Sequence, residues 1–330
     1  MRLDVQCRGM RAAYLLLAAL FGAFLAFQPA SAEPSPKELL AAGRVDEAIQ
    51  DLQRRIERTP TDAEAQNMLC RAYFMLDEWD HGIPACERAR NLDPQNSMYH
   101  LWLGRIYGEK ADRAGFLSAA GMAKKVRASF ERAVELDPKN WEARTDLAEF
   151  YLEAPGIVGG GKDKARAQAD AIMPLNPGMA HWVAARISEK EKDPAAAERE
   201  LRAAVAATHS GCRAWLDLAS FLRHSNRLSE MEQALHNLES GPIDHPAALV
   251  DGANMLLRTN RDLALAVRLV HRYLSNGPVE EAPAFKVHEL LGQILEKQGD
   301  RLAAAEQYRT ALSMAHAFIR AQEDLKRVQR

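Results

Sequence analysis

The stretch from Gly156 to Asp163 is the part of the chain most suggestive of chemistry, because GIVGGGKD has the GxxxxGK spacing of a phosphate-binding loop. Such a loop needs a Ser or Thr after the Lys to hold magnesium, and a β-strand before the first Gly. Here Asp163 follows Lys162 and would repel phosphate, and the preceding segment has helical periodicity. The sequence therefore predicts no nucleotide site. We expect a sharp glycine turn before a helix starting near Lys162, whose free N–H groups offer at most a weak anion site.

The cysteines suggest one possible covalent link. Cys70 and Cys86 fall on two consecutive predicted helices, and a turn near Glu78 would place them opposite each other. Two alternatives stay open: a disulfide in an oxidising compartment, or two small apolar side chains in the core. Cys7 belongs to the N-terminal segment, and Cys212 has no evident partner.

Other reactive residue types show no catalytic or metal-binding spacing. The ten histidines are scattered without HExxH or paired-ligand spacing, and the cysteines form no CxxC. Carboxylate pairs such as Glu149 and Glu153 fit solvated helical faces. We therefore expect no metal, no cofactor and no catalytic residue. The net charge of −2 is spread along the chain, which gives no reason to expect nucleic acid as a partner.

The N-terminal segment has the three parts of a secretory signal peptide. Three arginines precede an apolar run over residues 12–27, and small residues follow at positions 30–32. We expect residues 1–32 to be removed between Ala32 and Glu33, which takes away three arginines and one aspartate and leaves a net charge of −4. The alternative is an uncleaved membrane anchor, for which 16 apolar residues are slightly short.

The rest of the chain is predicted to be helical and repetitive. Apolar residues make up 47% of the sequence and aromatic residues 7%, with much Ala and Leu and few β-branched runs. Pro60, Pro94, Pro138 and Pro177 close similar phrases at intervals of 34, 44 and 39 residues. A period of 34 residues with two insertions indicates a repeat protein.

Within each interval, small and apolar residues fit two antiparallel helices that approach closely. The first repeat with this pattern places Leu69, Cys70 and Tyr73 on one helix, and Gly82, Cys86 and Ala89 on the next. The pattern returns with Leu103, Gly104, Tyr107, Phe130 and Ala133, with Leu147, Ala148, Tyr151 and Ala165, and with Leu291, Gly292, Leu295, Ala304, Tyr308 and Ala311.

At these residues the chain resembles the tetratricopeptide repeat family. In that family, helix A carries a large apolar residue, Leu, a small residue and Tyr, and helix B carries Ala, an aromatic residue, Ala and Pro. The resemblance covers nearly all of residues 33–330 and is best in the last unit. It implies an all-α fold, a right-handed α-α superhelix of about eight helix-turn-helix units with a C-terminal capping helix. Successive pairs must stack, because one pair cannot bury both of its faces.

The expected units span residues 33–60, 61–94, 95–138, 139–177, 178–209, 210–241, 242–280 and 281–316, with residues 317–330 as the cap. Insertions at residues 110–122 and 155–161 fall between helix A and helix B of the third and fourth units, on the same edge of the stack. A set of basic residues lies within or just after these insertions; this set, the basic rim, comprises Lys110, Arg113, Lys124, Lys125, Lys162 and Lys164. This rim either contacts an acidic partner or a phosphorylated envelope component, or consists of solvated lysines around tolerated loops.

The resemblance also implies a partner-binding groove formed by the A helices. Candidate residues near the small positions of the second and third units are Met68, Arg71, Phe74, Met75, Trp102 and Arg105. Their mixture of cation, aromatic ring and thioether suits peptide binding. Met68 and Trp102 have the alternative role of filling the core.

These observations predict an exported, periplasmic, non-catalytic scaffold that binds other proteins or peptides during envelope assembly, secretion or quality control. Residues 155–160 (PGIVGG) resemble a phrase found between helices of some exported bacterial tetratricopeptide proteins. Two alternatives remain: a scaffold tethered to the membrane by an uncleaved N-terminal segment, and an enzyme with an unrecognised site near residues 110–122 and 155–164.

Overall fold

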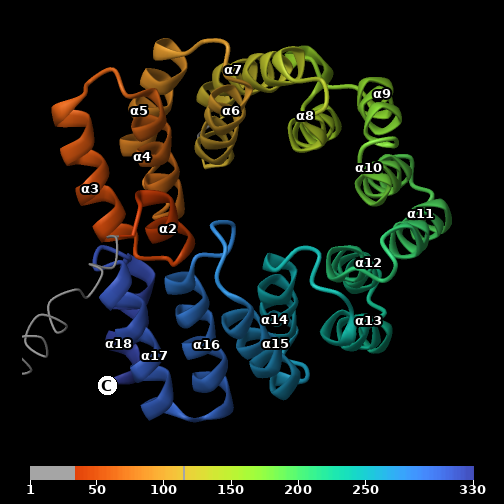
Figure 1. The fold of residues 1–330 in the computed structure, drawn as a ribbon. Coiled ribbons are helices and arrows are strands. Elements are labelled where there is room, and N and C mark those ends of the chain that lie inside the picture. The colour runs from red at the N-terminus through yellow and green to blue at the C-terminus, as the bar shows by residue number, and fades with distance from the viewer. Residues whose placement is uncertain (1–33, 114–115) are drawn as a thin grey trace, which may run out of the picture. The chain divides into compact units, whose positions relative to one another are not determined.

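Helices account for nearly all regular structure in the computed structural model, which describes residues 34–113 and 116–330 (Figure 1). These ranges contain seventeen α-helices, α2 to α18, and one short 3₁₀ helix, η1, with no strand among them. The predicted all-α fold is confirmed. The expected signal peptide of residues 1–32, with its cleavage site between Ala32 and Glu33, lies outside the described residues.

Eight pairs of antiparallel helices follow one another along the described chain, as the repeat pattern predicts, and α18 follows the last pair. In chain order they are α2 (Pro36–Ala41) and α3 (Val45–Arg58), α4 (Ala63–Met75) and α5 (Trp79–Leu92), α6 (Ser97–Asp112) and α7 (Phe116–Leu136), α8 (Trp141–Glu153) and α9 (Lys162–Ile172), α10 (Pro177–Lys190) and α11 (Pro194–Ala207), α12 (Cys212–His224) and α13 (Leu228–Ser240), α14 (Ala247–Thr259) and α15 (Leu263–Asn276), α16 (Ala284–Gln298) and α17 (Arg301–Met314), and α18 (Ile319–Val328), with η1 (Gly156–Val158) between α8 and α9.

The prolines mark helix boundaries together with the polar residues that follow them. After Pro138, the Asn140 side chain accepts a hydrogen bond from the N–H of Ala143 at 3.0 Å and caps the start of α8. Pro177 differs from the expectation that it closes α9, because it is the first residue of α10 and is preceded by the capping residue Asn176. Proline suits this position, since its missing N–H would have no partner in the first turn.

Small residues on the A helices admit large side chains from the B helices. Gly104 lies against the ring of Phe130, and Gly292 lies against the ring of Tyr308. A Cβ atom at either glycine would overlap the ring. The repeated small residues of the sequence therefore set how closely each pair packs.

Tyrosines of the A helices also join neighbouring pairs. The Tyr151 hydroxyl donates to Glu131 at 2.9 Å, and the Tyr107 hydroxyl donates to Glu87. Each acceptor stands 20 residues earlier, on the B helix of the preceding pair. Consecutive pairs are thus tied by polar contacts as well as by apolar packing.

The two insertions take different forms. The expected inter-helix loop over residues 110–122 is mostly helix, because α6 runs to Asp112 and α7 starts at Phe116 and is 21 residues long. Residues 155–161 instead form a tight turn that contains η1. This turn packs on α7, where Arg127 Nη1 donates to the Val158 carbonyl at 3.2 Å.

The two ends of the helix row meet, which the sequence did not predict. Figure 1 shows α2 and α3 next to the C-terminal helices. Leu39 and Leu40 of α2 share one buried apolar cluster with Phe285 of α16 and with Phe318, which precedes α18. The described helices therefore form a closed circuit around their inner face.

Candidate functional site

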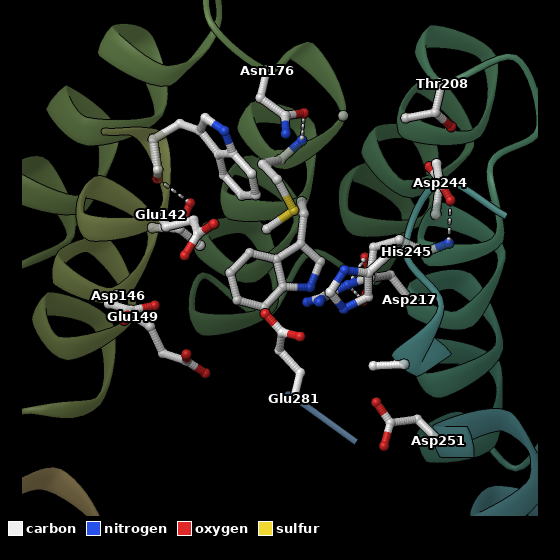
Figure 2. A pocket seen from close by; sticks show the side chains of 18 of the residues that line it. Glu142, Asp146, Glu149, Asn176, Thr208, Asp217, Asp244, His245, Asp251 and Glu281 are labelled. Atoms are coloured by element: carbon white, nitrogen blue, oxygen red, sulfur yellow. Dashed lines mark hydrogen bonds and ion pairs between the residues drawn. The ribbon is translucent and has the colours of Figure 1, made fainter. Parts of the chain in front are cut away.

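A cavity of about 610 Å³ lies on the inner side of the helix row, where the A helices of five successive pairs face it (Figure 2). The helices are α6, α8, α10, α12 and α14, and the loops after α11, α13 and α15 complete the wall. The lining residues are Arg105, Trp141, Glu142, Thr145, Asp146, Glu149, Asn176, Gly178, Met179, Trp182, Thr208, Arg213, Ala214, Asp217, Asp244, His245, Ala247, Asp251 and Glu281.

Helix α8 contributes three carboxylates to one wall. Glu142, Asp146 and Glu149 are spaced by four and three residues, which puts them on one helical face, and Figure 2 shows them together on one side. Arg105 donates to Asp146 from Nε at 2.6 Å and to Glu142 from Nη2 at 3.3 Å. Burial raises the pKa of Asp146, although Arg105 opposes this effect. Solvent in the cavity reaches Glu149, but the surrounding protein and the charge of Asp146 raise its pKa.

The opposite wall carries Asp217, Asp244 and Asp251 (Figure 2). Arg213 lies four residues before Asp217 on α12, and its Nε donates to both carboxylate oxygens at 3.1 and 3.2 Å. Burial, reinforced by the neighbouring Asp251 and Asp244, raises the pKa of Asp217 to about 6 despite this ion pair. Burial also raises the pKa of Asp251.

Aromatic rings add polarizable surface to the cavity. Trp141 and Trp182 both line it and are partly buried. The guanidinium carbon of Arg213 lies 6.0 Å from the centre of the Trp182 ring. Indole faces attract cations, so the wall offers a second kind of contact to a positively charged group beside its carboxylates.

The cavity is strongly negative overall. Its lining contains seven carboxylates and two arginines, a formal excess of five negative charges with a neutral His245. Burial and the charge of Arg213 lower the pKa of His245, so this imidazole is neutral at pH 7. Both arginines already pair with carboxylates, whereas Glu149, Asp251 and Glu281 form no ion pair with another described residue. The arrangement can therefore attract and hold a cation.

The one thiol beside the cavity is unsuited to act as a nucleophile. Cys212 is buried, and its Sγ donates to Asp244 Oδ1 and to the His245 carbonyl, both at 3.1 Å. Burial raises the pKa of Cys212 to about 11. The reactive thiolate form is consequently rare at neutral pH.

Four of the six groove candidates come together next to this cavity. The guanidinium carbons of Arg71 and Arg105 lie 4.9 and 5.0 Å from the centre of the Trp102 ring, and Phe74 packs edge-on against the same ring. Arg71 also forms an ion pair with Glu280, from the loop between α15 and α16. The predicted groove residues thus continue the cavity wall through Arg105.

The structure places the other two candidates, Met68 and Met75, in the core, which for Met68 is the alternative that the sequence left open. Their exposed fractions are 7% and 4%, and they belong to the apolar cluster that also contains Phe285. Both side chains therefore fill the core and do not line the groove.

The basic rim does not present six free cations. Lys110 pairs with Asp80, Lys162 lies 3.4 Å from Glu191, and Lys164 donates to the Gly159 carbonyl at 2.8 Å. The charged groups of Arg113 and Lys125 lie 4.3 and 4.9 Å from the ring centres of Trp79 and Tyr107, whereas Lys124 is exposed. Most of these charges are engaged locally, and a role in partner binding remains a prediction.

The glycine stretch forms a turn without the features of a phosphate-binding loop. Helix α8 precedes it in place of a strand. The N–H groups of Gly159, Gly160 and Gly161 donate to the carbonyls of Gly156, Pro155 and Tyr151 at 2.9, 3.2 and 2.8 Å. These amides are therefore not free to bind an anion. Glycine is required at 160, because a Cβ atom there would collide with the carbonyl of Ala154.

Cys70 and Cys86 face each other across α4 and α5. Their Cα atoms are 5.2 Å apart, within the range of a disulfide, and the structure joins their sulfur atoms. Both side chains are fully buried, as either of the two sequence alternatives requires.

The acidic cavity was missed by the sequence analysis, although the sequence contains a signal for it. Trp102 stands two positions before the small residue Gly104. Asp146, Asp217 and Asp251 stand two positions before Ala148, Ala219 and Ala253 in the later units. If the residue two positions before each small residue is taken to face the groove, as for Trp102, these units present three carboxylates on the inner face.

Within the described ranges, no group of three or more His, Cys, Asp or Glu side chains has an arrangement that could hold a metal ion. The same part of the chain contains no helix with both the length and the apolar character needed to cross a membrane.

Comparisons with known proteins point to one family. Two tetratricopeptide repeat models match the sequence, over residues 39–106 and over residues 285–317. No curated protein matches significantly by sequence.

The similar solved structures have low sequence identity to this chain. Yeast Tom70 is 15% identical with a TM-score of 0.51, and the match covers 92% of this chain and 66% of the Tom70 chain. A tetratricopeptide repeat protein of Thermus thermophilus is 18% identical with a TM-score of 0.47, covering 57% of this chain and 97% of that one. MamA is 17% identical with a TM-score of 0.40, covering 50% and 89%. This chain thus spans just under two thirds of the Tom70 chain.

Proposed function

We propose, from the premise that the chain is a tetratricopeptide repeat protein, that it binds a positively charged segment of another protein in its acidic cavity and performs no catalysis. Proteins with these repeats generally bind proteins or peptides. Because fold alone does not assign a role, the proposal depends on the cavity itself.

The observation that carries the proposal is the excess of five negative charges in the lining of the cavity, next to two tryptophans. Glu149 and Asp251 lie on α8 and α14, across the cavity from each other in Figure 2. A lysine or arginine side chain that enters can contact carboxylates of either wall and an indole face. Like charges held together also make the empty cavity costly, and a bound cation would relieve that repulsion.

The absence of catalysis is part of the proposal. The two arginines are held by Asp146 and Asp217, the imidazole of His245 is neutral, and the thiol of Cys212 is protonated. No nucleophile beside a general base is formed by these groups.

The compartment is proposed from the sequence. The basic and apolar N-terminal segment supports export, and the Cys70–Cys86 pair suits an oxidising compartment. We place the protein outside the bacterial cytoplasm, as an adaptor in envelope assembly, secretion or quality control. N-terminal sequencing of the protein from its native cells tests this placement. A start at Glu33 agrees with export and cleavage, and a start at Met1 contradicts cleavage and favours the tethered form.

The binding proposal is tested by calorimetry with two peptides of about 12 residues, one alternating Lys and Gly and the other alternating Glu and Gly. The Lys peptide should bind, with affinity falling as salt rises, and the Glu peptide should not. Replacing Glu149 by Gln and Asp251 by Asn together should remove about 2 kcal/mol of attraction, or roughly 30-fold in Kd.

A matched control carries the same change of charge on the outside of the row. Asp170→Asn with Glu306→Gln neutralises one exposed Asp on α9 and one exposed Glu on α17. This control should bind the Lys peptide within about twofold of the parent, since exposed distant charges are largely screened. Equal losses in the two double variants would show that binding reflects overall charge and would refute the cavity as the site.

A further inference from the structure

The ends of the helix row are held together by close apolar packing. Phe285 and Phe318 form an edge-on pair with ring centres 5.0 Å apart, inside the cluster that includes Leu40 of α2. Gly43, between α2 and α3, lies so near α16 that a Cβ atom there would be 2.6 Å from the backbone nitrogen of Ala284. We call this junction of α2–α4 with α16–α18 the seam.

Polar contacts reinforce the seam. Asp46 Oδ2 accepts hydrogen bonds from the backbone N–H and from Nδ1 of His316, both at 2.7 Å. Lys286 Nζ lies 3.0 Å from Asp77. These partners are 270 and 209 residues apart in sequence, so the contacts join the first two helix pairs to the last pair. The seam converts an open row into a closed circuit.

The segment over residues 277–283, which we call the strap, lies inside this circuit (Figure 1). The Tyr273 hydroxyl fixes its shape by accepting from the N–H of Val279 at 2.7 Å and donating to the carbonyl of Ala282. Glu280 then reaches Arg71 of α4, and Glu281 lines the acidic cavity. The cavity is bounded by A helices on one side and by the strap on another.

We infer that the closed circuit admits a partner only as an extended basic segment that enters with a free chain end, and that it excludes side-on docking of a folded domain. This inference rests on the proposed function and adds that the partner enters as an extended segment with a free chain end. In an open row, a helix or domain can approach the inner face from the side. Here the seam closes that route, and the cavity of about 610 Å³ has the volume of roughly 20 water molecules, enough for a few side chains.

The experiment locks the seam. The variant carries Asp46→Cys and His316→Cys in a Cys7→Ser background, and a short bismaleimide joins the two new thiols. The remaining cysteines do not compete for the reagent, because Cys212 is buried and Cys70 and Cys86 are bonded to each other. Two forms of the Lys–Gly peptide are compared by association kinetics. One has free ends, and the other has a small folded domain attached directly to each end. The matched controls are the two single-cysteine variants treated with the same reagent, which lose the same contact without being linked.

The free-ended peptide should bind the locked protein with a Kd within about twofold of its Kd for the controls. The blocked peptide should associate with the locked protein at least about tenfold more slowly than the free-ended peptide does. Equal association of both peptides with the locked protein would overturn the inference. Loss of free-ended binding on locking would overturn it as well, because it would show entry through the seam. If neither peptide binds even the unlocked controls, the proposed function itself fails and the inference falls with it.

Discussion

Asp217 should make the stability of the fold depend on pH, and replacing it by asparagine should remove that dependence. Its side chain is 11% exposed and pairs with Arg213, yet burial and the charges of Asp251 and Asp244 raise its pKa from 3.8 to about 6. Asparagine keeps nearly the same shape and an oxygen that can accept from Arg213, but it cannot ionise.

The direction of this pH dependence follows from proton binding in the folded and unfolded states. A carboxyl group with a raised pKa holds its proton more tightly in the folded state, so its stabilising effect is complete below pH 3.8 and is lost as pH rises through about 6. The shift of about two units corresponds to about 3 kcal/mol over the whole range. Between pH 5 and pH 7 the free energy of unfolding falls by about 1 kcal/mol through this one group.

Urea denaturation at pH 5 and pH 7 measures this loss. The free energy of unfolding of the parent should fall by about 1 kcal/mol more than that of Asp217→Asn between the two pH values. Asp170→Asn, an exposed change on α9, should follow the parent. Parallel behaviour of the parent and Asp217→Asn would refute the assigned pKa, and a parent that gains relative stability at pH 7 would reverse its sign.

Three further outcomes follow from the structure. A thiol count on the unfolded, unreduced chain from residue 33 onward should find one free thiol, from Cys212; three would exclude the Cys70–Cys86 bond. Gly160→Ala should destabilise by about 1–3 kcal/mol in thermal or urea unfolding, whereas Gly156→Ala, which has open space around it, should stay within about 0.5 kcal/mol. Affinity for the Lys peptide should fall from pH 7.5 to pH 5.5, since carboxylates with raised pKa values gain protons; affinity that rises on acidification would contradict the acidic site.

Local features of the fold were predictable from particular residues. The small positions Cys70, Gly104 and Gly292 identified the faces on which helices pair, and the structure uses them for close contacts. The period of the prolines predicted eight pairs, which are observed in the described chain. These features depend on contacts between neighbouring pairs, and such contacts recur in the sequence at a fixed spacing.

Closure of the row was not predictable in this way. The polar contacts of the seam, Asp46 with His316 and Asp77 with Lys286, are single contacts that do not recur along the chain. Their separations in sequence follow no repeat period. Whether two ends meet depends on a small rotation per repeat summed over eight pairs, which hydrophobic spacing does not specify. Met68, a groove candidate with core filling as its alternative, is buried in a cluster that includes Phe285 of the last pair.

The remaining difference at the site comes from the convergence of residues from separate helix pairs. In the sequence, Glu149 reads as one of many exposed helical carboxylates, and it is indeed exposed. Its significance comes from Asp251, which stands on α14, three helix pairs further along the chain than α8, and yet shares the same cavity. Three of the lining carboxylates stand two positions before small residues in the sequence, whereas their convergence with Glu149 on one cavity is a property of the folded circuit.

The central claim is that the inner face holds a basic segment of another protein. Photo-crosslinking from Trp182, replaced by benzoylphenylalanine, in an extract of the native cells tests it most directly. The same replacement at Trp79, whose ring lies beside Arg113 of the basic rim, is the control. Mass spectrometry should identify Lys- or Arg-rich, unfolded segments attached at position 182 and not at position 79. Acidic or folded segments at position 182, or the same segments at both positions, would contradict the account.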